Sequence, residues 1–300
     1  ERNRGRGIIA AGGAVSPYKD IQVVDIASSG IAQDFGDLLN TAQLSGSASS
    51  STRMLVAAGY IAPTQSNVIE FITIANIASS TDFGDLTQAR RRPQGLSNST
   101  RGVFVGGNAP PTAGVNTIDF VTIATAGNAS DFGDTNNSLA SNGGAIASST
   151  RGVYTIGGTP AYTNIVEFIT IATTGNGQDF GDLNGGTIGY HFRGSICDST
   201  RGLFAGGYDP AGNVQNKIDF VTIATTGNAT DFGDLTVARR SGGGTSNSIH
   251  SIFAGGYLPG VTNIIDRVVI QTTGNAADFG DLFFRTHENS GSSDSHGGLE

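Results

Sequence analysis

The sequence lacks tryptophan and holds one cysteine, Cys197, and one methionine, Met54. A single cysteine excludes an intramolecular disulfide, so no covalent cross-link holds this chain in shape. No stretch approaches the roughly 18 apolar residues of a membrane-spanning helix, and we therefore expect no membrane insertion. Apolar positions nowhere recur with the 3.6-residue period of an amphipathic helix, which favours an all-β fold.

Lysine is nearly absent, with two residues against 15 arginines, and charged residues make up only 14% of the chain. The formal net charge of −8 argues against nucleic acid as a partner, because binding to phosphates needs a basic surface. Glycine is abundant instead, at 45 of 300 residues, about twice its average usage. Low lysine, low cysteine and much Gly, Ser, Thr and Asn suit an extracellular or virion setting.

One tetrapeptide, Asp-Phe-Gly-Asp, occurs six times, at residues 34–37, 82–85, 131–134, 179–182, 231–234 and 278–281. Successive copies are 48, 49, 48, 52 and 47 residues apart. A nearly constant period over the whole length indicates one structural unit copied six times within a single domain of residues 1–300.

Each unit contains four short strand-like segments. In one unit these are a small-residue segment, then 101–107, which ends in Gly-Gly, the β-branched and aromatic segment 118–124, and the Asp-Phe-Gly-Asp motif after a Gly-Asn turn. Four antiparallel strands per repeat are typical of a propeller blade. The sequence therefore predicts a six-bladed β-propeller.

The two ends of the chain predict how the ring closes. The chain starts with strand 2 of a blade, Gly7–Gly12, and lacks strand 1. Measured from the last motif, the text around Asp294 matches the end of strand 1 in other repeats. We expect the C-terminal segment to supply strand 1 of the N-terminal blade, which leaves no unpaired edge between blades. Residues 296–300 beyond it suggest a tail or a cloning remnant.

The repeat resembles the kelch repeat. The resemblance is carried by the strand ending in Gly-Gly, the acidic-aromatic strand, the Gly-Asn turn and the pattern Leu-Thr-x-Ala-Arg, clearest at Leu86–Arg90 and Leu235–Arg239. It implies a β-propeller, with Phe in the place of the kelch tryptophan. The units are also loosely similar to kelch-like proteins of tailed phages, which implies a component of a virion appendage.

The motif itself predicts a packing and turn device. We expect its phenylalanine to pack between neighbouring blades, its glycine to permit a β-bulge, and its carboxylates to accept hydrogen bonds from turn amides. A calcium site is the alternative, because carboxylates suit hard cations, but the ligand density of known loops is missing. No metal or cofactor is expected. The phenylalanines are Phe35, Phe83, Phe132, Phe180, Phe232 and Phe279.

Two further sets of charged residues recur. Arginines begin strand 2 at the blade end that also holds the motif carboxylates, and this predicts a structural ring of ion pairs. A second acid or amide lies 12 residues before each motif, on strand 3. Strand 3 is far from the axis, so these groups cannot converge on one substrate, and we interpret them as blade-face or turn residues. The arginines are Arg53, Arg101, Arg151 and Arg201; the strand 3 residues are Gln22, Glu70, Asp119, Glu167, Asp219 and Asp266.

Length variation between repeats falls on two of the four connections. The strand 2–3 and 4–1 loops vary, whereas the 1–2 and 3–4 turns hardly change. In an up-and-down blade the two variable loops share one face, and insertions in repeat proteins often mark the binding face. Tyrosines and arginines collect in these loops: Tyr18, Tyr60, Tyr162, Tyr190, Tyr208, Tyr257, Arg91, Arg193 and Arg240.

Two interpretations of these loop residues remain open. Tyrosine offers a flat apolar face with a polar tip, which suits recognition, but an aromatic ring after Gly-Gly also packs on its neighbours. The sequence predicts a non-enzymatic binding or structural propeller that recognises a glycan or protein surface, without catalytic residues. The alternative is a lyase or hydrolase at the central channel. That enzyme would need charged groups near the axis, where the strand 1 segments offer mostly Gly, Ser and Ala.

Overall fold

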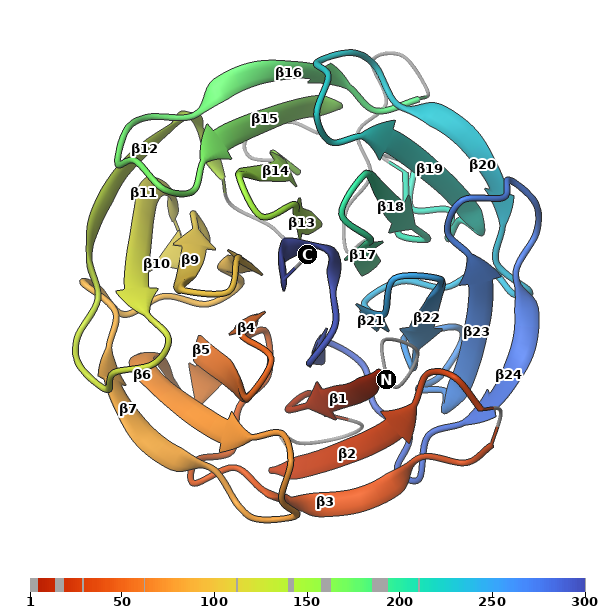
Figure 1. Ribbon diagram of the computed structural model, residues 1–300, viewed down its shortest axis with the longest axis horizontal. Helices are drawn as coiled ribbons and strands as arrows, with labels where there is room; N and C mark the ends of the chain where they lie inside the picture. The colour runs from red at the N-terminus through yellow and green to blue at the C-terminus, as the bar shows by residue number, and fades with distance from the viewer. Residues whose placement is uncertain are drawn as a thin grey trace.

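A computed structural model describes residues 5–13, 19–28, 30–61, 63–111, 113–139, 143–157, 163–184, 194–209 and 211–299. They form six antiparallel sheets of four main strands around a central channel, a six-bladed β-propeller (Figure 1). In each blade the first strand lies beside the channel and the fourth at the rim. The helical part of the described residues is one 3-10 turn, η1 (Gly297–Leu299).

The strands follow the predicted order in every blade. Blade 1 contains β25 (Ser290–Ser293), β1 (Arg6–Ala10), β2 (Asp20–Asp25) and β3 (Gln33–Asp37). Blade 2 contains β4 (Gly46–Ser49), β5 (Arg53–Ile61), β6 (Thr64–Thr73) and β7 (Thr81–Asp85). Blade 3 contains β8 (Gln94–Ser97), β9 (Arg101–Val105), the short β10 (Asn108–Ala109), β11 (Ala113–Thr122) and β12 (Ser130–Leu139).

The second half of the ring repeats the pattern. Blade 4 contains β13 (Ala145–Ala147), β14 (Arg151–Thr155), β15 (Ile165–Thr170) and β16 (Gln178–Asp182). Blade 5 contains β17 (Gly194–Cys197), β18 (Arg201–Ala205), β19 (Lys217–Thr222) and β20 (Thr230–Asp234). Blade 6 contains β21 (Gly243–Ser246), β22 (His250–Ala254), β23 (Ile264–Val269) and β24 (Ala277–Asp281).

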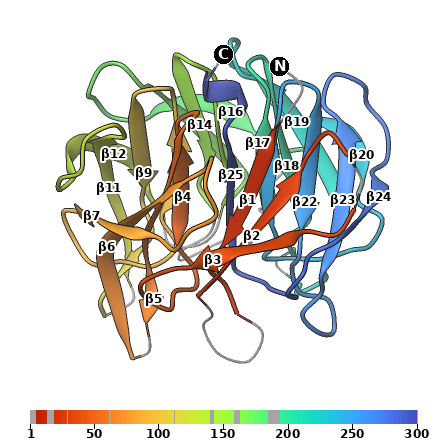
Figure 2. The same ribbon diagram turned by 60° about the horizontal axis from the view of Figure 1, so that its bottom comes forward.

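The ring closes through its two ends, as the sequence predicts. Strand β25 pairs antiparallel with β1, from Gly7 opposite Ser293 to Ala10 opposite Ser290. The six innermost strands also contact one another in an unbroken circle. We call the face with the strand 1–2 and 3–4 connections the turn face, and the opposite face, with the 2–3 and 4–1 connections, the loop face. In Figure 2 the chain end near η1 lies on the turn face, at the top of the view.

Hydroxyl groups of the innermost strands tie neighbouring blades together. The Ser97 hydroxyl donates to the Ser49 carbonyl at 2.8 Å, and the Ser49 hydroxyl donates to the Ser293 carbonyl at 2.7 Å. The same donation to the preceding blade continues through Ser293, Ser246 and the Cys197 thiol, which reaches the Ala147 carbonyl. This hydroxyl belt spans five blade junctions near the turn face and supplies buried carbonyls with donors. It is interrupted between blades 4 and 3, where Ala147 has no hydroxyl.

The hydrophobic core is divided into six clusters, and each one lies between two blades. The cluster between blades 2 and 3 shows the pattern, with Leu55 and Ile69 of one blade against Phe104 and Val121 of the next. Phe83 of the Asp-Phe-Gly-Asp motif lies in this cluster, 2% exposed. The other five motif phenylalanines occupy the equivalent clusters, which confirms their predicted place between blades.

The rest of the motif joins strand 4 to the next blade. The register shifts at the motif in each of the six blades, which confirms the predicted bulge. Gly84 has a φ of +144°, and a Cβ there would lie 2.5 Å from the Gly127 carbonyl. The Asp85 amide donates to the side chain of Asn128 at 3.0 Å. We expected the motif carboxylate to accept a hydrogen bond from a turn amide; here the backbone amide of the second motif Asp donates to a turn side chain instead.

The predicted ring of arginine ion pairs is wrong. Arg101 donates to the carbonyls of Ile171 and Ala172 in the next blade, at 3.0 and 2.9 Å. Its guanidinium lies 4.7 Å from the centroid of Phe120 in its own blade. Arg53 and Arg151 have the same two kinds of contact, and Arg201 donates to one such carbonyl. The arginines bond carbonyls because these lie at the blade junction, whereas the motif belongs to the outermost strand of the blade.

Truncation tests whether β25 closes the ring. A chain ending at Asn289 loses β25 and exposes both the edge of β1 and the blade 1 side of two hydrophobic clusters. We expect its melting temperature to fall by roughly 10 °C or more, since each kcal/mol shifts the midpoint of a chain this long by a few degrees. A chain ending at Ser295 keeps β25 and is the control. Equal melting of the two truncations would contradict closure by β25.

Candidate functional site

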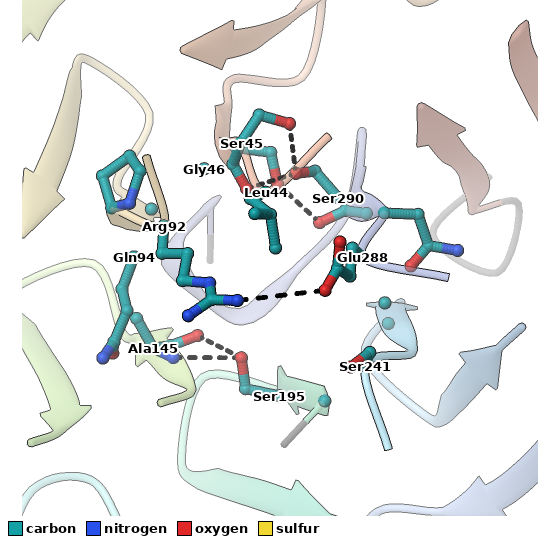
Figure 3. A pocket seen from close by; sticks show the side chains of 18 of the residues that line it. Leu44, Ser45, Gly46, Arg92, Gln94, Ala145, Ser195, Ser241, Glu288 and Ser290 are labelled. Carbon is teal, nitrogen blue, oxygen red and sulfur yellow. Dashed lines mark hydrogen bonds and ion pairs between the residues drawn. The ribbon is translucent and has the colours of Figure 1, made fainter. Parts of the chain in front are cut away.

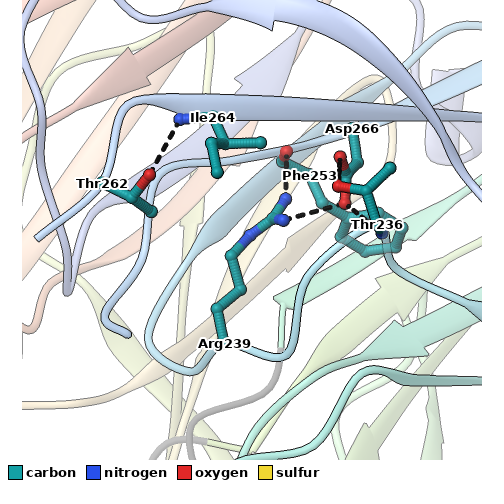
Figure 4. A network of polar contacts seen from close by, with 6 residues as sticks. All are labelled: Thr236, Arg239, Phe253, Thr262, Ile264 and Asp266. Carbon is teal, nitrogen blue, oxygen red and sulfur yellow. Dashed lines mark hydrogen bonds and ion pairs between the residues drawn. The ribbon is translucent and has the colours of Figure 1, made fainter. Parts of the chain in front are cut away.

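The strand 3 acids are buried links between blades, so our interpretation of them as blade-face or turn residues is wrong. The Asp119 carboxylate accepts hydrogen bonds from Thr87 and lies 2.7 Å from Arg90, both in the segment that leaves the preceding blade. Asp266 binds Thr236 and Arg239 in the same way, and Arg239 also donates to the carbonyl of Phe253 (Figure 4). Both carboxylates are fully buried and paired, so they are not open to a ligand and stabilise the junction between blades.

The same link is made with other residues elsewhere in the ring. Glu70 accepts hydrogen bonds from the amides of Leu39 and Asn40, and Glu167 accepts one from the amide of Asn136. The uncharged Gln22 exchanges two hydrogen bonds with the backbone of Phe284, across the closure of the ring. Asp219 is fully buried as well. The Arg of the Leu-Thr-x-Ala-Arg pattern is thus a buried partner of an acid where it occurs.

Five of the predicted ligand-binding residues lie around the channel on the loop face: Tyr60, Tyr208, Tyr257, Arg91 and Arg240. All five are half-buried. The other four, Tyr18, Tyr162, Tyr190 and Arg193, lie outside the described residues.

Backbone pairing brings the tyrosines and arginines together. The residue after the Gly-Gly of strand 2 pairs with the 4–1 loop of the preceding blade. The Arg240 amide donates to the Tyr257 carbonyl at 3.1 Å, and the Tyr257 amide donates back at 2.7 Å. Tyr60 pairs with Gln43 in the same manner. The 2–3 loop of one blade and the 4–1 loop that leads into that blade are therefore held side by side at the mouth of the channel.

Four side chains contact one another in a row at this mouth. The Arg240 guanidinium lies 5.1 Å from the ring centroid of Tyr208 and 5.0 Å from that of Tyr257. The Tyr257 ring lies 5.5 Å from the ring of His287. We call Tyr208, Arg240, Tyr257 and His287 the mouth cluster. Both interpretations of the tyrosines describe it in part, since the rings pack on neighbours and remain partly exposed.

A second ring of residues turns side chains toward the axis. Leu44, Arg92, Ser241 and Glu288 each lie two residues before an innermost strand and have positive φ angles of 62°, 62°, 60° and 56°. This left-handed conformation is unfavourable for residues other than glycine. It is fixed here by hydrogen bonds between blades, from Glu288 N to Ser241 O at 2.6 Å, from Leu44 N to Glu288 O at 3.1 Å, and from Arg92 N to Leu44 O at 2.6 Å.

Arg92 and Glu288 face each other across the channel. Arg92 Nη2 is 4.0 Å from Glu288 Oε1, and the side chains are 19% and 16% exposed (Figure 3). Burial lowers the pKa of Arg92; Glu288 opposes this shift, and Arg91 and Arg240 add to it. The sequence pattern did not indicate this pair, although both residues hold the same repeat position, two residues before an innermost strand. An ion pair therefore lies near the axis, where we expected mostly Gly, Ser and Ala.

The pair stands in a cavity of about 120 Å³, which we call the mouth pocket. Its wall is made of glycines, serine hydroxyls and the side chains of Gln94 and Asn289. A second cavity of about 50 Å³ lies closer to the turn face, and a ring of small residues separates it from the mouth pocket. That ring consists of Ser47, Gly95, Ala145, Ser195, Gly244 and Gly291.

The C-terminal residues close the channel at the turn face. His296 is 9% exposed and lines the second cavity, with Nε2 3.1 Å from the Ser49 carbonyl and 3.3 Å from the Ser97 hydroxyl. A Cβ on Gly298 would lie 1.8 Å from the Ser97 carbonyl, so η1 sits directly on the innermost strands. We call residues 294–299 the C-terminal plug. The suggested tail at 296–300 therefore includes residues that are packed into the propeller.

Comparisons with known proteins leave the chain without an assigned family. No protein-family model matches it, and no similar curated protein is found. The kelch and tailed-phage resemblances therefore stay predictions. Among the described residues, no group of three or more His, Cys, Asp or Glu could hold a metal ion. The described part of the chain also contains no helix long and apolar enough to cross a membrane.

The buried pair of Arg90 and Asp119 gives a stability test. Asp119→Ala leaves the Arg90 guanidinium buried without its carboxylate, and we expect the free energy of unfolding to fall by about 3–5 kcal/mol. The double variant Arg90→Met, Asp119→Leu removes both charges and should lose much less. Denaturant unfolding of the three proteins measures the difference. Equal losses in the single and double variants would contradict a structural role for the pair.

Burial of His296 predicts a dependence on pH. Burial lowers its pKa to about 4, so the folded protein favours the neutral ring. The stabilisation is present above the unfolded pKa, near 6.5, and is lost as pH falls toward 4. We expect a loss of about 3 kcal/mol over this window, because one pKa unit corresponds to 1.36 kcal/mol. The free energy of unfolding of the protein and of His296→Asn is measured at pH 7 and pH 4.5. An equal loss between the two pH values in both proteins would refute this prediction.

Proposed function

We propose that this propeller is a non-enzymatic binding protein that recognises a carbohydrate at the loop-face mouth of its channel. The observation that carries the proposal is the mouth cluster beside a polar pocket. A sugar ring presents C–H bonds on its faces and hydroxyl groups at its edge. Tyrosine rings suit the faces, and a pocket lined by hydroxyls, an amide and an ion pair suits the edge.

The mouth cluster is already ordered without a ligand. Arg240 is held by backbone hydrogen bonds to Tyr257 and by stacking on two rings. Side chains that are fixed before binding lose little conformational entropy when a ligand arrives. This supports a binding site over an accidental arrangement of surface residues, since a weak ligand such as a sugar depends on low ordering costs.

The location of the charges also supports a ligand at this mouth. The chain has a net charge of −8, and many of its acids lie in the motifs at the rim. Arg91, Arg92, Arg240 and His287 gather on the loop face instead. This concentration of donors near the axis suits a ligand rich in hydroxyl oxygens. A protein surface is the competing partner, and an extracellular or virion appendage remains the proposed setting, which detection of the protein in purified particles would test.

Arg92 and Glu288 favour one second candidate, an enzyme acting at the channel. They provide a cation and a carboxylate close to the axis, and general acid–base chemistry requires groups within hydrogen-bond reach of one reacting centre. A lyase or hydrolase would release shorter products from a bound oligosaccharide. Product analysis after incubation with each binding glycan separates the two functions, since a binding protein leaves its ligand intact.

A glycan array with purified protein and three variants tests the proposal. We expect Tyr257→Ala and Tyr208→Ala to weaken binding by tenfold or more, as removal of a central aromatic contact commonly does. Tyr257→Phe keeps the ring and should bind nearly as well as the unchanged protein. Thermal melts establish that each variant is folded. Binding of no glycan, or equal binding by the alanine variants, would refute the proposal.

A further inference from the structure

We infer that the mouth pocket holds the end of the carbohydrate chain, with one hydroxyl group of an uncharged terminal sugar placed between Arg92 and Glu288 and the neighbouring hydroxyl directed to the pocket wall. This inference rests on the proposed function and specifies its ligand. It follows from three properties of the channel: it is closed at one end, its pocket is small, and its wall contains hydrogen-bond acceptors that lack donors.

The closed end selects chain ends over chain interiors. The C-terminal plug crosses the turn-face end of the channel, where His296 contacts Ser49 and Ser97 of two blades. Gly297 and Gly298 lie against the Asp198 and Ser97 carbonyls, in blades 5 and 3. A polysaccharide therefore cannot thread through the ring. A ligand that enters from the loop face meets a dead end and must present a terminus.

The size of the pocket limits what enters it. Its volume of about 120 Å³ is below the 300–1,000 Å³ of pockets that enclose a whole drug-sized ligand. At about 30 Å³ for each water of liquid volume, it has room for roughly four waters. One edge of a sugar ring with its hydroxyl groups fits this space. The ring face then remains outside, at the level of the mouth cluster.

The acceptors in the wall call for a ligand with O–H donors. Gln94 is 5% exposed and its Nε2 donates to the Thr155 carbonyl at 2.7 Å, which fixes the orientation of the amide. Its Oε1, like Asn289 Oδ1, is buried without a hydrogen-bond partner among the described residues. A buried acceptor without a donor is costly. Both oxygens have almost no accessible surface, so a ligand hydroxyl that removes this cost reaches them only after the amides turn toward the pocket.

Gln94 is an exception to the repeat. The other five blades have a small residue at the equivalent position, at the start of the innermost strand or directly before it: Gly46, Gly144, Gly194, Gly243 and Ser290. A side chain of this size narrows one side of the pocket and carries an amide oxygen into its wall. The channel wall therefore departs from sixfold symmetry next to Arg92. An asymmetric ligand can bind there in one preferred orientation.

The ion pair suits an uncharged diol. A hydroxyl oxygen can lie about 2.8 Å from both groups when they are 4.0 Å apart, as Arg92 and Glu288 are. The hydroxyl then accepts from the guanidinium and donates to the carboxylate, and its neighbour on the sugar reaches the amide acceptors. A sugar carboxylate would instead face the negative charge of Glu288. The pair thus selects neutral over acidic terminal sugars.

The experiment measures binding of single sugars to the whole protein. A panel of methyl pyranosides of the common neutral hexoses is titrated by ligand-observed NMR, together with analogues that lack one hydroxyl and a methyl hexuronide. We expect at least one neutral pyranoside to bind, with a loss of about tenfold on removal of one hydroxyl of the diol, which contacts charged groups. The hexuronide should bind more weakly than its neutral counterpart.

Protein variants and glycans with a blocked terminal sugar complete the test. Glu288→Gln and Gln94→Met should weaken binding of the pyranoside by about tenfold, whereas Asp131→Asn, at the rim, is the control and should bind unchanged. If a variant does not fold, the deoxy analogues with the unchanged protein decide the matter. Glycans that bind on the array equally well when their terminal sugar is blocked, or a pyranoside panel that does not bind, overturn the inference while the glycan-binding proposal stands. Absence of any glycan binding overturns both.

Discussion

The junction between neighbouring blades is the constraint on which the structure depends. A four-stranded sheet has two faces, and each blade buries them only against the blades beside it, in the six shared clusters. The junction between blades 2 and 3 is also fastened at three distances from the axis. The hydroxyl belt acts near the channel, the strand 3 acids act in the middle, and the Asp-Phe-Gly-Asp motif acts at the rim. A ring without an open edge keeps all of them satisfied.

One substitution within the repeat keeps a cation beside an aromatic ring of the same blade. In blades 2 to 5 an arginine at the start of strand 2 stacks on a phenylalanine of strand 3. In blade 6 the first position is His250, and the strand 3 position is Arg267, which lies 5.1 Å from the ring of Phe279. The positive charge over an aromatic ring is thus preserved by moving it to another strand. Burial and the nearby Arg267 lower the pKa of His250, which favours its neutral form.

The functional hypothesis follows from the same geometry. The backbone links that join blades on the loop face also hold Tyr208, Arg240 and Tyr257 in contact and turn Arg92 and Glu288 toward the axis. Those links fix every group of the proposed site on the ring rather than on a free loop. A rigid scaffold of this kind suits recognition of a ligand with many weak, directional contacts. The mouth therefore gains its order from the interactions that stabilise the fold.

The sequence by itself determined the repeat, the six blades, the closing strand and the place of the motif phenylalanines. Those features follow from periodicity and strand patterns, which are local or repeat at a constant interval. It also indicated the face on which we propose the site, because loop lengths vary there. The tertiary structure alone decided the partners of charged groups. Arg101 donates to carbonyls of the next blade, and Gln22 hydrogen-bonds to the backbone of Phe284, 262 residues away. Arg92 and Glu288 meet only because the ring closes. The partner of a charged group is selected by burial and by the distance between blades, and no single repeat encodes either of these.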